Sequence, residues 1–415
     1  MPSNQILTIS DITQEALAVL SNETVFARGI NREYDNKFAV DGAKIGATLN
    51  IRRPARFQGT VGPALNVEGF EETYSPLTLT TQFHIDTQFN SVDLTLSMSD
   101  FSARVLRPAI SQIATKIDYD MLQIATNNTA NLVGTPGTLP ASILPFLTAQ
   151  AYLDAEAAPR DGDRSCYTDP FTNVTLASSL FTYFNPQAQV SEAFRKGMMG
   201  KDSGGMSWLM DQNVAQHTYG FASAAPTVTV NGANQGITTG WSQFGTLNIT
   251  TAQNITLNVG DTFTIAGVYG VNPQNRQSYG KLRNFVVTAA VNAGTGAQTL
   301  SISPNIISSG QFQNVNAAPA AGAALTFASL PVGAANQVTG PQSLVIHKNA
   351  FTLGMADLIV PEGVAFAGRA SDKMAGMSIR VVKQYTINND SLPTRLDVLY
   401  GGAPLYPELS CRVTG

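Results

Sequence analysis

The side chains that most often carry out chemistry are few in this chain and lie far apart along it. The three histidines are His84, His217 and His347, and no HExxH, HxxxH or CxxC arrangement is present to hold a zinc ion. The glycine patterns that place a nucleophilic serine or cradle a phosphate are also missing from the sequence. We therefore expect no enzyme activity and no cofactor.

Two pairs of aspartates have the residue type of a site but not its spacing. Asp161 and Asp163 resemble the start of a calcium loop, but the third ligand, the loop glycine and the distal glutamate are not at the required positions. Asp118 and Asp120 lie two residues apart on a predicted helix, so their carboxylates do not face each other as an acid–base pair. The sequence therefore predicts no metal site.

The composition limits the class of protein and its partners. Charged residues make up 13% of 415 residues and the formal net charge is −4, so no broad basic face is available to grip nucleic acid. Turn residues are too abundant for a helical bundle, and the chain is too apolar for disorder. Cys166 and Cys411 form no disulfide framework. Without a secretory signal or an apolar run of about 18 residues, we expect a soluble protein and no membrane.

The longest predicted element is a helix within the stretch Ser91 to Asn128. From Pro108 to Thr126 it would run about 28 Å. Pro108 suits its first turn, and a shorter helix capped by Ser99 or Asp100 is expected before it. The apolar residues repeat at steps of three and four, the period of one helix face: Leu106, Ile110, Ile113, Ile117, Met121 and Ile124.

A long hairpin is predicted in front of that helix, because residues 45–51 and 77–89 alternate as half-buried strands. The intervening residues 52–76 would project about 35 Å and could not bury themselves, so we expect them to lie across a neighbouring copy. Opposite charges toward the two ends would suit head-to-tail contacts between copies: Arg52, Arg53 and Arg56 at the base, and Glu68, Glu71 and Glu72 further on. A solvated charged loop is the alternative.

The remaining segments indicate a β domain inserted into a mixed α/β domain. Residues 1–40 begin with an amphipathic helix that packs either on another surface or on its own domain. Residues 143–225 have helix patterns at 145–157, 174–184 and 190–196, and residues 343–358 are predicted as a strand followed by a helix. Residues 226–340 consist of short strands with turn signals, typical of a small all-β barrel or sandwich.

The inserted segment is almost uncharged. Its four charged side chains are Asp261, Arg276, Lys281 and Arg283, and three of them fall in the predicted loop 271–283. The mixed pattern resumes near residue 341, so the chain leaves one domain and returns to it.

Four strings resemble the major capsid proteins of tailed phages, the Hong Kong 97-type fold. They are YLDAEAAPRDGDRSCYTDP at 152–170, LVIHKNAFTLGMADL at 344–358, INNDSLPTRLDVLYGGAPLYPEL at 387–409 and, within the insert, GDTFTIAGVYGVNPQNRQSYGKLRNFVVTA at 260–289. The last is similar to the inserted β-barrel domain of the short-tailed Salmonella phage type of coat protein. The order of arm, hairpin, helix and α/β domain resembles that family as well.

The resemblance implies an α+β fold with a definite division of the chain. The parts are an N-terminal arm at 1–40, a peripheral domain at 41–142 and 377–415 with the extended hairpin 52–76 and the spine helix 108–126, an axial domain at 143–225 and 341–376, and the inserted domain at 226–340. Residues 271–283, with Arg276, Lys281 and Arg283, would be the contact loop of the insert. The sequence has no lysine between Lys44 and Lys116, so we expect none of the covalent hairpin cross-links found in some family members.

The resemblance also implies the function and the partners. Copies of the chain would form pentamers and hexamers of an icosahedral virion capsid, assembled in the host bacterial cytoplasm around double-stranded DNA without reading its sequence. A scaffolding protein, a portal protein and a decoration protein are the expected partners.

Two other classes stay open on the residues alone. An exported carbohydrate-binding or adhesin protein would use residues 226–340, but it needs an export signal and clustered aromatics, and Trp208, Trp241 and Tyr269 are scattered. A hydrolase with a β accessory domain would need the catalytic signatures that are missing.

Overall fold

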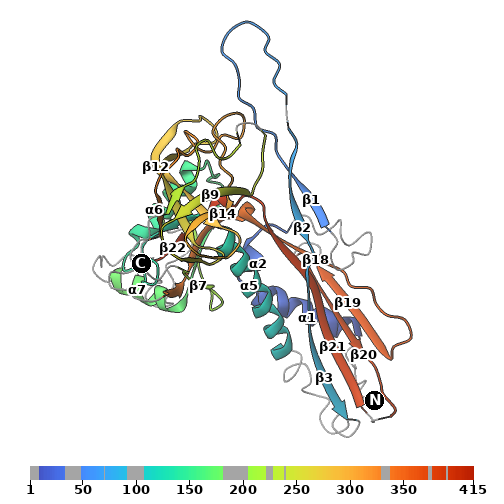
Figure 1. Cartoon of the computed structure of the whole chain (residues 1–415). Helices are drawn as coiled ribbons and strands as arrows, with labels where there is room; N and C mark the ends of the chain where they lie inside the picture. Colours follow the sequence, from blue (N-terminus) through green and yellow to red (C-terminus); the bar gives the residue numbers. More distant parts are fainter. Residues whose placement is uncertain are drawn as a thin grey trace. The chain divides into compact units, whose positions relative to one another are not determined.

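The structure, a computed structural model, describes residues 9–32, 48–69, 71–90, 107–180, 204–220, 228–237, 240–328, 337–372, 376–388 and 391–415 (Figure 1). The helices expected just before Pro108 and at 190–196 lie outside these residues. The chain divides into two compact units. Unit 1 contains residues 1–51, 76–121 and 351–403, and unit 2 contains residues 52–75, 122–350 and 404–415.

Unit 1 is built on an antiparallel sheet of strands that are far apart in sequence. β21 (Ser391–Pro404) pairs with β20 (Met377–Lys383) and with β3 (Thr81–Asn90), while β19 (Phe366–Asp372) pairs with β20. β18 (Phe351–Ala356) also pairs with β21. Helix α1 (Ile9–Glu23) packs on β19 and β20 and buries Ala16, Leu17 and Leu20. The arm helix therefore packs on its own unit, one of the two expected possibilities.

The predicted long helix is confirmed as α5 (Arg107–Asn128). Ile110, Ile113, Ile117 and Met121 are fully buried, as their spacing indicates. Buried Asp118 accepts hydrogen bonds from Val25 N at 2.7 Å and Ala27 N at 2.8 Å, the free N–H groups at the start of α2 (Phe26–Gly29). No helix among the described residues has the length and apolarity to cross a membrane.

The hairpin root is formed by β1 (Thr48–Arg53) and β2 (Thr73–Thr78), which pair as a two-stranded sheet. The single strand predicted at 77–89 is divided in the structure, because the chain breaks at Leu79 and Thr80 into β2 and β3. The two pieces pair with different partners, β1 and β21, so a single straight strand could not serve both. Figure 1 shows the residues between β1 and β2 as a long loop drawn in blue.

The central sheet of unit 2 has the order β4-β22-β17-β5-β6. Its strands are β4 (Asn131–Val133), β22 (Ser410–Val413), β17 (Ser343–His347), β5 (Arg164–Thr168) and β6 (Ser207–Met210). The same unit contains the helices α6 (Leu144–Ala155) and α7 (Pro170–Leu180), which lie near the predicted positions. Phe146, Leu153, Trp208 and Val345 belong to the core that α6 shares with this sheet.

The helix predicted in the second half of 343–358 is wrong. After a single 3₁₀ turn, η4 (Lys348–Ala350), the chain forms β18, and every residue of β18 is buried. A short segment that is buried on both faces is hard to assign as a strand or a buried helix from sequence alone.

The inserted segment forms a six-stranded antiparallel sheet of order β15-β11-β12-β14-β9-β8. These strands are β15 (Leu325–Phe327), β11 (Thr262–Val271), β12 (Ser278–Val287), β14 (Gly296–Ser303), β9 (Gly245–Thr251) and β8 (Val228–Val230), and a small pair is formed by β10 (Ile255–Leu257) and β13 (Val291–Ala293). Val230 N donates to Ala323 O at 2.9 Å, which brings the two edges together and nearly closes a barrel.

Two predictions about the insert can be compared with the structure: its entry and exit from the chain, and its loop 271–283. β7 (Gln216–Thr218) and β16 (Thr339–Pro341) pair side by side where the chain enters and leaves, as expected for an insertion. The loop predicted at 271–283 is too long, because β12 begins at Ser278 and places Lys281 and Arg283 on a strand.

Candidate assembly interface

The loop of the hairpin exposes large apolar side chains with little support of its own. Val61 and Leu65 are 104% and 91% exposed, and Phe57 and Val67 are exposed as well. Among its described residues, two hydrogen bonds cross the loop, from Gln58 N to Glu68 Oε2 at 2.8 Å and from Asn66 Nδ2 to Thr60 Oγ1 at 2.9 Å. Several exposed apolar side chains on one loop are typical of an interaction surface.

The hairpin charges are arranged differently from the predicted separation toward two ends. Arg52 and Glu72 face each other across the root, with Nη1 and Oε2 3.6 Å apart and both side chains exposed. Glu71 is exposed, and Glu68 is half-buried against the backbone of Gln58. Because the chain turns back on itself in the loop, Glu71 and Glu72 lie at the root of the hairpin, near the arginines, and not at its far end.

Arg53 lies inside its own chain. Its Nη2 donates to Glu408 Oε1 at 2.8 Å, and its guanidinium lies over the rings of Tyr406 at 4.2 Å and Trp241 at 4.6 Å. Arg56 Nη2 approaches the same Glu408 oxygen at 3.8 Å. Burial alone would raise the pKa of Glu408, but the Arg53 and Arg56 guanidiniums outweigh it and lower the pKa below its ordinary value.

A second buried ion pair lies beside the first. Arg283 of β12 bonds to Glu156, and Tyr279 donates to the same Glu156 oxygen at 3.2 Å. Burial raises the pKa of Glu156, and nearby Arg283 opposes that rise. Both pairs line one cavity of about 40 Å³, together with the side chains Arg56, Trp241 and Gln243. We call this group, centred on Glu156 and Glu408, the ionic junction.

The predicted contact loop of the insert meets the hairpin of its own chain. Arg276 donates through Nη2 to Phe57 O at 2.7 Å and through Nη1 to Gln58 O at 3.4 Å. Arg283 is buried in the ionic junction, and Lys281 is exposed on β12. The three predicted residues thus have three different environments.

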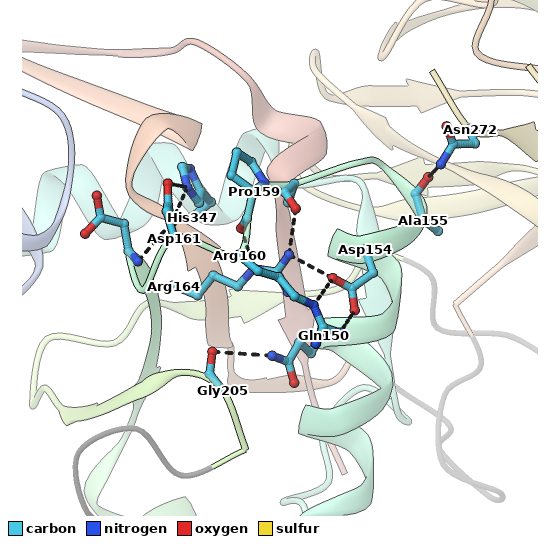
Figure 2. Close-up of polar contacts among 12 residues, drawn as sticks. Gln150, Asp154, Ala155, Pro159, Arg160, Asp161, Arg164, Gly205, Asn272 and His347 are labelled. Carbon is cyan, nitrogen blue, oxygen red and sulfur yellow. Dashed lines mark hydrogen bonds and ion pairs between the residues drawn. The ribbon is translucent and has the colours of Figure 1, made fainter. Parts of the chain in front are cut away.

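The end of α6 is tied to the insert and to β5, as Figure 2 shows. Asp154 binds Arg160 and also buried Arg164, whose Nη2 lies 2.8 Å from Asp154 Oδ1. Asn272 of the insert donates to Ala155 O at 3.0 Å. Hydrogen bonding from Arg160, followed by Arg164, lowers the pKa of Asp154 against the opposing effect of burial.

The residues first considered for chemistry have structural contacts instead. Asp161 Oδ2 lies 3.1 Å from buried His347 Nε2, and Asp261 Oδ1 lies 2.8 Å from buried His217 Nε2. Both cysteines are free and buried, and burial raises the pKa of each thiol. Within the described ranges, no three His, Cys, Asp or Glu side chains are grouped to hold a metal ion.

Sequence reasoning did not place Glu156, Glu408 or Trp241 in the ionic junction. Glu408 is 355 residues from Arg53, and Glu156 is 127 residues from Arg283. No local spacing signals such pairs. One hint was available: Glu156 and Glu408 both lie in segments whose sequence resembles the capsid family, at 152–170 and 387–409.

Comparisons with known proteins identify the family. The model of the family "P22 coat protein - gene protein 5" matches residues 2–415. No curated protein matches the sequence significantly.

Several solved phage structures are similar to the chain. That of Mycobacterium phage Che8 has 12% identity and a TM-score of 0.47, covering 94% of this chain and 90% of its own. The mature capsid of bacteriophage PhiM1 has 11% identity and a TM-score of 0.41, covering 94% and 86%. The CUS-3 coat protein I-domain has 31% identity and a TM-score of 0.20, covering 25% of this chain and 97% of its own.

The family match confirms the predicted α+β Hong Kong 97-type fold with an inserted β domain, and it confirms a structural rather than an enzymatic protein. The adhesin and hydrolase alternatives are thereby excluded. The chain belongs to the P22 coat protein family, and it is therefore a tailed-phage major capsid protein that assembles with copies of itself into the icosahedral shell of the virion.

Proposed function

We propose that the shell is held together by the hairpin 52–76, whose apolar loop lies on a neighbouring copy within pentamers and hexamers. The exposure of Phe57, Val61, Leu65 and Val67 is the observation that carries this proposal. Each such side chain gains about 1.5–3 kcal/mol when it is buried. Each copy would bind one neighbour with its own hairpin and be bound by the hairpin of another. The free energies of these contacts then add up around a ring of copies.

A second surface supports contacts around the axis of each capsomer. Large apolar side chains are exposed on α6, on α7 and at the end of β6: Leu144, Leu147, Phe171, Val174 and Met210. Asn173 of α7 lies 3.9 Å from the Met210 sulfur, so the α7 and β6 parts adjoin. These residues fall in the proposed axial domain, 143–225 with 341–376, and we assign them to contacts between copies.

The finer partners follow from the same role. The shell encloses double-stranded DNA without reading its sequence, and the net charge of −4 suits a wall that does not trap the packed genome. Assembly takes place in the host cytoplasm, guided by a scaffolding protein and started at a portal, with a decoration protein as a further partner. Arg52, Arg56, Glu68, Glu71 and Glu72 remain the proposed polar contacts of the hairpin.

The test is a double substitution in the loop, V61S with L65S. Both side chains are exposed, so the monomer should keep its unfolding temperature, while the critical concentration for shell formation should rise more than about tenfold. Electron microscopy and sedimentation of the purified protein measure shell formation. The matched control is T60A with N66A in the same loop, which should assemble normally. Normal shells from V61S/L65S would overturn the proposal.

A further inference from the structure

The hairpin loop cannot fix its own direction. Between β1 and β2, the described residues 54–69 and 71–72 form no strand, and the two hydrogen bonds that cross the loop are exposed. An unsupported loop of this length would sample many directions, and ordering it on binding would cost free energy. Support therefore has to come from outside the loop.

Two separate loops of the inserted domain hold the two sides of the hairpin. Arg276, at the tip between β11 and β12, donates to Phe57 O and Gln58 O on the outgoing side. Gln311, between β14 and β15, donates through Nε2 to Gly69 O at 2.6 Å on the returning side. Both donors bind backbone carbonyls, so they fix the course of the chain whatever side chains the loop carries.

Arg276 is held in an unusual conformation while it does so. Its backbone φ angle is +56°, in the left-handed region, which residues other than glycine, asparagine and aspartate seldom adopt. Asn272 O accepts from Arg276 N at 2.9 Å, and Asn272 Nδ2 donates to Ala155 O, so the tip is fixed to the end of α6.

The insert also holds both strands of the hairpin at the root. Trp241 lies against the Arg53 guanidinium on β1, and Gln243 Oε1 accepts from Ser75 Oγ on β2 at 3.5 Å. Gln243 Nε2 donates in turn to Pro404 O at 3.3 Å. The Glu156–Arg283 pair of the ionic junction anchors β12 beside the same cavity.

We propose that the inserted domain is a brace that fixes the direction of the hairpin in its own copy, before assembly, with Arg276 and Gln311 as positioning residues. This inference rests on the proposed function of the hairpin. A braced loop meets its neighbour already ordered, which lowers the entropy cost of each contact in the shell.

The first measurement is made on the full-length, unassembled chain. Cysteines placed at exposed Thr60 and Asn292 carry spin labels, and the distance distribution between the labels is recorded. Native Cys166 and Cys411 are buried with raised thiol pKa values and do not compete for the label. We expect one narrow peak in the parent and its loss in R276N/Q311A. Asparagine accepts the left-handed backbone, so the change removes only the guanidinium.

Controls separate bracing from general damage. K281A removes an exposed charge from β12, the strand that follows the Arg276 loop, and should keep the narrow peak. R276K, which retains a donor, should keep most of it. If the brace holds the loop in a direction that is otherwise populated about a tenth of the time, R276N/Q311A should weaken assembly about tenfold. The single variants R276N and Q311A should each widen the peak partly.

The outcomes distinguish this inference from the proposed function. An unchanged narrow peak in R276N/Q311A overturns the brace, even if V61S/L65S abolishes shells and so leaves the hairpin contact standing. A broadened peak together with normal shells from V61S/L65S upholds the brace and overturns the hairpin contact.

Discussion

At the scale of single residues, the ionic junction decides whether the hairpin root is stable. Glu408 holds Arg53, whose side chain is 6% exposed, and Arg56 approaches the same oxygen. Removing one partner of a buried pair leaves the other charge without compensation. We expect E408Q to lower the free energy of unfolding by about 3 kcal/mol in urea denaturation. The exposed control E71Q should change it by less than about 0.5 kcal/mol.

The same substitution has a signature in pH. The pKa of Glu408 is lowered in the folded protein from its ordinary value of 4.5. As pH falls toward and below 4.5, this carboxylate therefore binds a proton more readily in the unfolded chain than in the folded one. The stability that Glu408 contributes is therefore complete above that value and is lost as pH falls through the lowered pKa. Unfolding free energies between about pH 6 and pH 3 should fall more steeply in the parent than in E408Q. Equal slopes would contradict the role of this carboxylate.

Most of these contacts between residues could not be predicted from the sequence. The charges of the hairpin could be read directly, and so could the absence of the spacings that make a zinc site or a nucleophile. The partners of Arg53 and Arg283 could not be read, because Glu408 and Glu156 meet them only through the fold. The spacing of Asp118 and Asp120 argued against an acid–base pair, but the hydrogen bonds from Val25 and Ala27 to Asp118 could be found only in the structure.

At the scale of elements, the predictions succeeded where a period was clear. α5 was found from its helical repeat, and β1, the outgoing strand of the hairpin root, from its alternation. β18 was missed because all of its residues, including polar Thr352, are buried, and a short fully buried segment is hard to assign as strand or helix from sequence alone. The break between β2 and β3 was missed because alternation continues through Leu79, although the hydrogen-bond partners change there.

β21 approaches the chain closely at that break. A Cβ added at Gly401 would lie 2.1 Å from Thr78 O, a backbone atom that cannot move cheaply. We expect G401A to destabilise the protein by about 1–3 kcal/mol through overpacking. At Gly69 an added Cβ meets nothing within 4 Å, so G69A is the matched control. Equal thermal unfolding temperatures for the two variants would show that β21 does not require this glycine.

At the scale of the whole chain, the shift to an almost uncharged, turn-rich composition at residues 226–340 predicted an inserted β domain. The paired strands β7 and β16 form the neck of that insertion. Composition could not show which of its loops would touch the hairpin, because the contacts of Arg276 and Gln311 are with backbone carbonyls. The compact unit that contains the insert also contains hairpin residues 52–75, as a brace requires.

The central claim is that another copy covers the apolar hairpin loop. A photo-activated cross-linking residue placed at Leu65, in purified assembled shells, tests it directly. The account predicts that light joins neighbouring chains, giving dimers and longer ladders on a denaturing gel from shells but not from the unassembled protein. Cross-links confined to single chains in intact shells would contradict it.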